Sequence, residues 1–476
     1  MKNFRISAIL YCLGFFYGFS QNLETSYSNY FELPREQVFL HLNKTKFVTG
    51  ETLWFKAYVT DQKYGILNPL TKNLYVGIYD EDGVELQKQL WYVEDGMTHG
   101  QLEITKEFLT GEYYIKASTN YMKNFGPEQN YLQKISVINL SEEVKWSYKT
   151  SSSTNNAVLN ILPEGGAFVL NTLNSVGVKL TDTLGYGYAE VRLSVKNQTG
   201  DIITETVTNR FGHARFDIQP NPGDSFQVIA EDLATEGLTN FKTNGITMRV
   251  NALLNQQVIV ELNTNTSTIN RIKDKKYQLL VHRDGLVFKI PVVFGAEELK
   301  KTIQIPRSML LPGVNILTLF NEQEQPILER MLFNQTDKLS TEDFLQVEYL
   351  GKNMDSMAVA LKYNTDEIWH LSASFLPSET DAYKPEHNIY SALLLKPYLK
   401  GFIENAPYYF QNASDRKTKL DLDLLLLTQG WSSYDWYSIQ QGIKPFKFNF
   451  EQGLSLRGKV YVDENVRRLK KYEVLI

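Results

Sequence analysis

Cysteine is almost missing from this sequence, since Cys12 is the one thiol among 476 residues. It lies in an N-terminal apolar run that we expect to be removed on export. A mature chain without cysteine has no disulfide bond, thiolate nucleophile, cysteine metal ligand or internal thioester. Its stability must therefore come from a buried hydrophobic core. Cysteine-free exported chains are common in bacteria, which favours a bacterial envelope protein.

Charge of one sign and long apolar runs are missing as well. The chain has 49 Lys and Arg against 54 Asp and Glu, a formal net charge of -5, and no long run of either sign. We expect no nucleic-acid partner, because nucleic-acid binding needs a basic surface. Beyond the N-terminus no apolar stretch approaches the roughly 20 residues that span a bilayer as a helix. We therefore expect no transmembrane helix in the mature chain.

The N-terminus has the pattern of a signal peptide. Lys2 and Arg5 precede an apolar run over 6–19, and polar residues follow at once. We predict that residues 1–20 are cleaved and that the protein is exported, to the periplasm or to the outer membrane. A buried helix or a membrane anchor is the weaker alternative, because the run is too short to span a bilayer.

Aromatic residues are plentiful, and they favour a mainly β fold. The chain has 28 Tyr and 26 Phe, whose flat rings pack well on pleated sheets. Apolar residues alternate over 37–48 and again over 53–59, the period of a half-buried strand, and Asp82-Gly83 is typical of a hairpin turn. The length favours three or more domains of roughly 100 to 150 residues. We predict tandem macroglobulin-like or immunoglobulin-like β-sandwiches.

Domain boundaries follow from changes in this texture. The polar run 150–156 separates the first two units, and leucines at helical spacing near the C-terminus (Leu420, Leu424, Leu427) indicate a small helical insert. The predicted units are sandwiches over 33–140, 157–245 and 246–335, a β-domain with the helical insert over 336–450, and the opening of a further, truncated β-domain over 454–476.

Several segments resemble a known family. The stretch from Gln37 to Val59, with a strand, a Gly-Glu turn and a second strand, resembles the second macroglobulin-like domain (MG2) of the α2-macroglobulin superfamily. Four later segments are similar to those of a group of exported MG2-containing proteins of Bacteroidota, and the whole resemblance covers most of residues 30–450. These segments are Leu162–Gly166, Leu311–Val314, Leu328–Phe333 and Leu422–Trp431.

The resemblance implies more about the chain. In that group the chain commonly continues into a carboxypeptidase-regulatory-like domain and sometimes a domain like the plug of TonB-dependent receptors. Residues 454–476 lie where the regulatory-like domain would begin. Protease-trapping macroglobulins use a Cys-Glu-Gln thioester, which a chain without cysteine cannot form.

No pattern in the sequence assembles an active site. The acidic pairs Asp80/Asp82 and Asp421/Asp423 are better explained as a turn and a solvated helix face than as calcium ligands. The glycine pairs lack the Lys and Ser/Thr of a phosphate loop. We predict no enzyme, no catalytic residue, no cofactor and no metal site. No His-x-His or His-Glu-x-x-His spacing occurs among the six histidines, which are His41, His99, His213, His282, His370 and His387.

Four aromatic residues near the C-terminus are the candidate partner surface: Trp431, Tyr434, Trp436 and Tyr437. Such rings supply much contact area with little loss of entropy. The alternative is that they cap the core of the fourth unit, next to its leucine run.

The expected function is that of a non-enzymatic envelope scaffold or binding protein. Its expected partners are envelope or outer-membrane proteins, with a link to TonB-dependent transport. One alternative is a thioester-free macroglobulin-type protease inhibitor, for which 150–156 is the candidate bait segment. Another is a hydrolase of envelope polymers, which would need a pair of carboxylates across a cleft.

Overall fold

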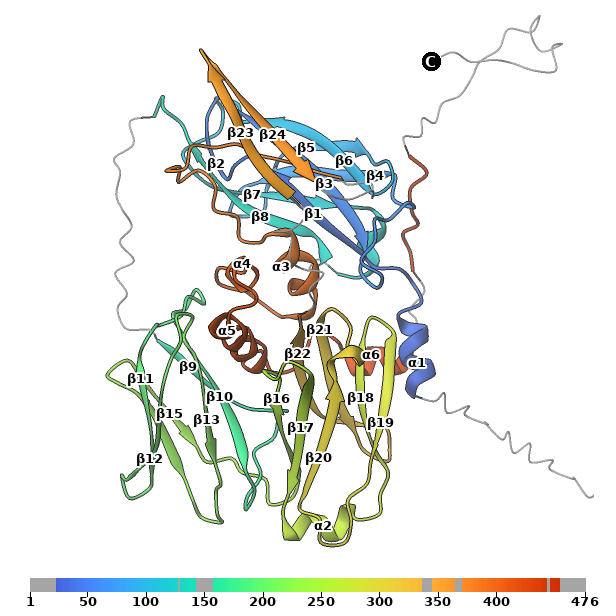
Figure 1. Ribbon diagram of the computed structural model, residues 1–476, viewed down its shortest axis with the longest axis vertical. Coiled ribbons are helices and arrows are strands. Elements are labelled where there is room, and N and C mark those ends of the chain that lie inside the picture. The colour runs from blue at the N-terminus through green and yellow to red at the C-terminus, as the bar shows by residue number, and fades with distance from the viewer. Residues whose placement is uncertain are drawn as a thin grey trace, which may run out of the picture.

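The computed structural model describes residues 23–126, 129–142, 157–335, 345–363, 370–442 and 446–453. The predicted signal peptide, the polar run 150–156 and the predicted domain opening at 454–476 lie outside these residues. Figure 1 shows a mainly β molecule, with one sandwich above, two sandwiches side by side below, and short helices between them. The predicted fold class is confirmed.

The first sandwich packs two sheets on one core. Alternation predicted strands over 37–48 and 53–59, and the long antiparallel pair of this sandwich lies there, with Leu40 opposite Ala57. Side chains from both sheets, such as Leu40 and Ile115, meet in one hydrophobic cluster. A short helix, η1 (Tyr121–Asn124), follows β7. One sheet has the order β1 (Glu36–Leu42), β3 (Thr52–Asp61), β6 (Met97–Glu103), and the other β2 (Lys46–Val48), β8 (Tyr131–Ile138), β7 (Gly111–Ser118), β4 (Asn73–Tyr79), β5 (Glu85–Tyr92).

The second sandwich pairs a three-stranded with a four-stranded sheet. Strand β10 is buried along almost its whole length because it is the central strand of its sheet. Val178 and Val228, from opposite sheets, are both fully buried in the shared core. The strands are β9 (Val158–Pro163), β10 (Asn174–Thr181), β13 (His213–Ile218) in one sheet, and β12 (Ile202–Val207), β11 (Arg192–Asn197), β14 (Phe226–Ala230), β15 (Ala234–Leu238) in the other.

The third sandwich repeats this arrangement of three and four strands. All eight residues of β21 are buried, since sheet neighbours flank it and helices cover its outer face. Two short helices, α2 (Thr266–Ile272) and η3 (Arg307–Met309), connect strands. The sheets have the orders β16 (Ile246–Asn251), β17 (Gln257–Thr264), β20 (Lys300–Pro306), and β19 (Leu286–Val292), β18 (Tyr277–Arg283), β21 (Gly313–Phe320), β22 (Pro326–Asn334).

The C-terminal part differs from the β-domain predicted over 336–450. Within the described residues its strands form one two-stranded hairpin, and its helices have no separate core. They pack instead on Phe211 of the second sandwich and on Val314, Ile316 and Met331 of the third. The elements are the hairpin β23 (Leu345–Asn353) and β24 (Ser356–Tyr363), the helices α3 (Ile389–Leu394), η5 (Lys396–Tyr398), α4 (Tyr408–Gln411), α5 (Arg416–Leu427), α6 (Trp436–Gln441), and, at the N-terminus, α1 (Leu23–Tyr30).

Helix α5 is the buried centre of this C-terminal part. Asp415 caps it by accepting a hydrogen bond from the backbone N–H of Thr418. Leucines supply most of its buried side chains, but Asp421 and Asp423 are buried as well. The interpretation of these two aspartates as a solvated face is therefore wrong, because each has a polar partner inside the protein.

Arg330 of β22 makes a buried ion-pair junction between the two lower sandwiches and α5. Its Nε donates to Oε1 of Glu164 at 3.0 Å, and one terminal nitrogen donates to Oδ1 of Asp423 at 2.7 Å. Arg215 pairs with the other carboxylate oxygen of Glu164 at 3.0 Å. Burial alone lowers the pKa of Arg330, but the two carboxylates outweigh it and raise that pKa. The junction joins three parts of the chain at one point.

Three of the segments that carry the family resemblance meet at this junction. Glu164 belongs to 162–166, Arg330 to 328–333 and Asp423 to 422–431. The first and third also touch directly: Gly166 has φ of 103°, and a Cβ there would lie 2.8 Å from the indole Nε1 of Trp431. These segments thus hold the sandwiches and the helices together.

Residues 370–388, which we call the strap, hold the first sandwich. The backbone N–H of Thr45 donates to the carbonyl oxygen of Ala382 at 2.7 Å. Nδ1 of His41 lies 2.6 Å from the hydroxyl oxygen of Ser372. The strap therefore links the first sandwich to the C-terminal helices mainly through polar contacts.

A second C-terminal segment, 446–453, lies against another side of the same sandwich. The ring of Phe450 stacks on Tyr121 with centroids 3.9 Å apart. The side-chain amide of Asn124 donates to the carbonyl oxygen of Phe448 at 2.7 Å. The first sandwich is thus held from two sides by the end of the described chain.

We expect Arg330→Met to lower the free energy of unfolding by about 3–5 kcal/mol, because it leaves two buried carboxylates unpaired. Denaturant titration followed by circular dichroism measures this. Lys88→Met, which breaks the exposed pair with Glu85, is the control and should change stability little. Adding Glu164→Gln and Asp423→Asn to the first variant should restore part of the loss. An Arg330→Met protein as stable as the parent would contradict the assigned role of the junction.

Candidate functional site

The predicted partner surface does not form one exposed face. Trp436 is 5% exposed, and its indole N–H donates to Oε2 of Glu329 at 2.9 Å. The hydroxyl of Tyr434 lies 2.7 Å from Oδ1 of Asp284, and Trp431 packs beside both rings. Tyr437 alone of the four is exposed, at 73%. The structure therefore corrects the interpretation of Trp431, Tyr434 and Trp436 as an accessible surface: they cap a core, as the alternative held.

Behind these rings lies a buried polar network. His282 places Nδ1 2.9 Å from the hydroxyl of Tyr27 and Nε2 2.8 Å from the hydroxyl of Thr318. The Thr318 hydroxyl donates to Glu329 at 3.0 Å. Burial lowers the pKa of His282 to about 3. The network ties helix α1 to the third sandwich, and its histidine stays neutral at physiological pH.

Asp284 is the second buried acid of this region. Its carboxylate accepts hydrogen bonds from the hydroxyls of Tyr398 and Tyr434 and from the amide of Gln62 at 2.8 Å. Burial raises the pKa of Asp284, although these tyrosine hydroxyls act in the opposite direction. Because Gln62 follows β3, the network extends from the third sandwich to the first.

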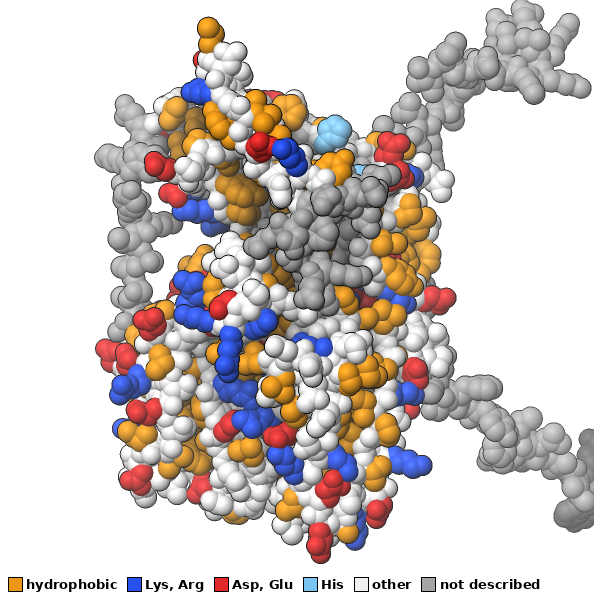
Figure 2. All heavy atoms as spheres, in the orientation of Figure 1, with side chains coloured by type: hydrophobic (Ala, Val, Ile, Leu, Met, Phe, Trp, Pro, Cys, Tyr) orange, Lys and Arg blue, Asp and Glu red, His pale blue; other side chains and the backbone are white. Residues whose placement is uncertain are grey.

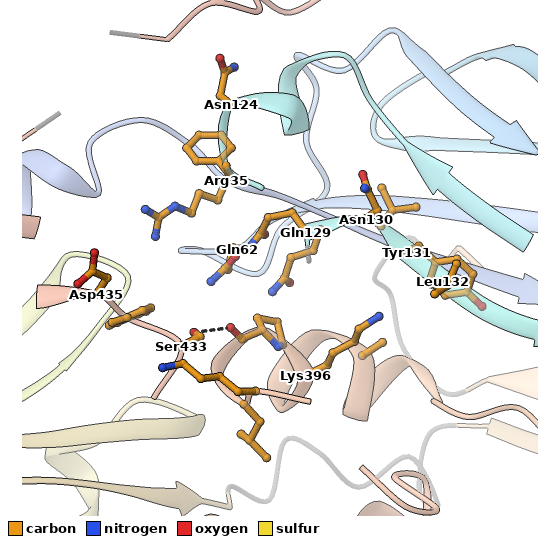
Figure 3. Close-up of a pocket in the computed structure, with 18 of the residues that line it drawn as sticks. Arg35, Gln62, Asn124, Gln129, Asn130, Tyr131, Leu132, Lys396, Ser433 and Asp435 are labelled. Atoms are coloured by element: carbon orange, nitrogen blue, oxygen red, sulfur yellow. Dashed lines mark hydrogen bonds between the residues drawn. The ribbon is translucent and has the colours of Figure 1, made fainter. Parts of the chain in front are cut away.

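Above this network a cleft of about 700 Å³ separates the first sandwich from the C-terminal helices. Figure 3 shows Arg35, Gln62 and Gln129 on the side of the first sandwich and Lys396 and Ser433 on the opposite side. A volume of this size lies within the usual range of ligand pockets. The cleft is the strongest candidate for a binding site in the described part of the chain.

The lining of the cleft carries more positive than negative charge. Its cations are Arg35, Lys396 and Lys400, and its one acid is Asp435. The carboxylate of Asp435 accepts hydrogen bonds from backbone N–H groups at the start of α6. Burial lowers the pKa of Lys396 despite the nearby charge of Glu386. An anion in the cleft would therefore meet a favourable field.

The histidine of the cleft does not offer a neutral-pH base. Burial, helped by the charge of Lys396, lowers the pKa of His387 to about 4, and its Nδ1 lies 3.2 Å from the hydroxyl of Ser391. Among the described residues, no three His, Asp or Glu side chains gather closely enough to hold a metal ion. Of the helices in these residues, none combines the length and apolar character needed to cross a membrane.

A second cavity, of about 390 Å³, lies between the two lower sandwiches beside α5. Its charged groups already have partners: Arg249 pairs with Asp217 at 3.0 Å and lies 3.7 Å from Glu261. Arg215 pairs with Glu164. This cavity offers a ligand less unpaired charge than the cleft does.

Sequence reasoning missed the cleft residues altogether. Arg35 and Gln62 lie more than three hundred positions before Lys396, and no spacing rule joins them. One signal was present: Arg35 and Gln62 flank the strand pair that was predicted over 37–59. That signal marks an end of a sandwich, but it does not say what faces it.

We expect His282→Gln to weaken the pH dependence of stability. The folded protein keeps His282 neutral down to about pH 3, whereas an unfolded chain binds the proton near pH 6.5, so stability falls as pH falls through this window. The contribution is up to about 1.4 kcal/mol per pH unit. Unfolding by denaturant at successive pH values measures it. The exposed His99→Gln is the control, and parallel curves for His282→Gln and the parent would contradict the assignment.

Comparison with known proteins gives distant likenesses of fold. No family model and no curated protein matches the chain. Native Escherichia coli alpha-2-macroglobulin is similar at 11% identity and a TM-score of 0.19, over 67% of this chain and 24% of that one. Latent PorU from Porphyromonas gingivalis is similar at 10% identity and a TM-score of 0.29, over 64% and 34%. The chain thus spans about a quarter to a third of these proteins, and it is a mainly β protein of tandem sandwich domains.

Proposed function

We propose that this chain is an exported, non-enzymatic scaffold or binding protein of the bacterial cell envelope. In this proposal the sandwiches form a rigid body that presents a surface to envelope or outer-membrane proteins. The resemblance of several segments to exported MG2 proteins supports a link to TonB-dependent transport. The observation that carries the proposal is the hairpin β23–β24, which projects from the body of the molecule (Figure 1).

One face of the hairpin is apolar and open to solvent. Its register places Leu345 opposite Tyr363, Val347 opposite Leu361 and Tyr349 opposite Val359, so all six side chains share one face. Val347 is 64% and Tyr349 60% exposed. Figure 2 shows hydrophobic side chains at the projecting end of the molecule. Exposed apolar surface of this kind marks interaction sites.

The hairpin is also open at its edges. It is a two-stranded sheet, so in the described chain neither strand has a second neighbour. Such a pair is marginally stable alone in water. An extended segment of another protein that adds a strand would satisfy the free backbone groups and cover the apolar face. The proposed partner is therefore an envelope protein that offers an extended segment with alternating apolar side chains.

The protease-inhibitor alternative has no comparable support. Its candidate bait segment, 150–156, lies outside the described residues. The described chain adds no observation that favours trapping of a protease over binding of an envelope partner.

We expect Val347→Lys with Tyr349→Lys to reduce capture of the outer-membrane partner about tenfold or more, because two apolar contacts are lost. The measurement is crosslinking of the tagged chain in outer-membrane preparations, with quantitative mass spectrometry. Gln346→Lys with Ala360→Lys places the same two charges on the opposite face and should leave capture unchanged. Equal capture by both variants, or no reproducible partner of the parent chain, would count against the proposal.

A further inference from the structure

The cleft between the first sandwich and the C-terminal helices has two unpaired cations. Over the described residues, neither Arg35 nor Lys396 forms an ion pair. The guanidinium of Arg35 lies 4.2 Å from the ring centre of Phe31 and 4.9 Å from that of Tyr30. Lys396 lies on the opposite wall, half-buried beside His387 (Figure 3). Two cations on facing walls suit a ligand with an anionic group.

The cleft also has an unmet hydrogen-bond acceptor. Gln62 is 6% exposed, and its amide nitrogen donates to Asp284 at 2.8 Å. Its Oε1 is buried and has no hydrogen-bond partner among the described residues. A buried acceptor without a partner costs roughly 1–3 kcal/mol. A ligand with a hydroxyl group would supply the missing donor.

Further amides and rings surround these groups. Gln37, Gln129 and Asn130 line the same wall as Gln62. Side-chain amides both donate and accept, which matches the two-way hydrogen bonding of hydroxyls. Tyr131 adds a ring that can lie against an apolar sugar face.

We propose that this cleft binds an acidic sugar, a ligand with a carboxylate and several hydroxyls. Arg35 and Lys396 hold the carboxylate from opposite walls, and Gln62 with its neighbouring amides holds the hydroxyls. The volume of about 700 Å³ accommodates a ligand of disaccharide size. The site lies apart from the hairpin face, so its failure would leave the proposed scaffold function untouched.

The test is isothermal titration calorimetry of the full chain with digalacturonate. Binding in the micromolar to millimolar range is expected, and it should weaken as salt is added. Lys396→Gln should weaken it about tenfold or more, since a charged hydrogen-bond donor is lost. Lys352→Gln, which removes an exposed lysine of the hairpin, is the matched control and should bind as the parent does. Arg35→Gln is the second variant should Lys396→Gln fail to fold.

Three comparison probes separate the alternatives. Lactose, a neutral disaccharide, should bind far more weakly than digalacturonate. Inorganic phosphate should compete poorly, because it lacks the hydroxyl array. Polygalacturonate binding as tightly per site would identify a polymer end as the source, and its failure beside binding of the disaccharide would identify a free sugar acid. No heat with digalacturonate, equal binding of lactose, or tighter binding of phosphate would overturn the proposal.

Discussion

Burial of the Arg330 guanidinium is the constraint on which the rest of the molecule depends. A guanidinium without water needs its donors satisfied, and here the acceptors come from the second sandwich and from α5. Neither Glu164 nor Asp423 can move without leaving a buried charge unpaired. The two lower sandwiches and the helix are therefore locked in one arrangement. The helices that this arrangement positions form one wall of the cleft.

The first sandwich is attached by a different kind of contact. Polar and backbone bonds to the strap and ring stacking at 446–453 hold it, and the Gln62–Asp284 bond links it to the third sandwich. Interfaces of this polar kind are typical of domains that move relative to one another. A cleft opens at this boundary because the facing surfaces are not packed side chain to side chain. The same boundary brings unpaired cations and amides face to face.

Local patterns predicted the local structure well. Alternation over 53–59 corresponds to β3, and Asp82-Gly83 lies in the turn between β4 and β5, with Gly83 at φ of 80°. Patterns were weaker where burial depends on distant partners. Asp423 was assigned to a solvated face because its partner, Arg330, is 93 residues away. The cleft lay further out of reach, since no spacing rule relates residues of its two walls.

The strap sets an order of events in the life of the chain. Thr45 and its partner Ala382 are 337 residues apart. At about 5–20 residues per second, synthesis of that interval takes on the order of tens of seconds. During this time the first sandwich has its strands but lacks the strap that covers its β1 side. The nascent protein therefore passes through a stage in which this side is exposed to chaperones and export factors, and the last segments made complete the first domain.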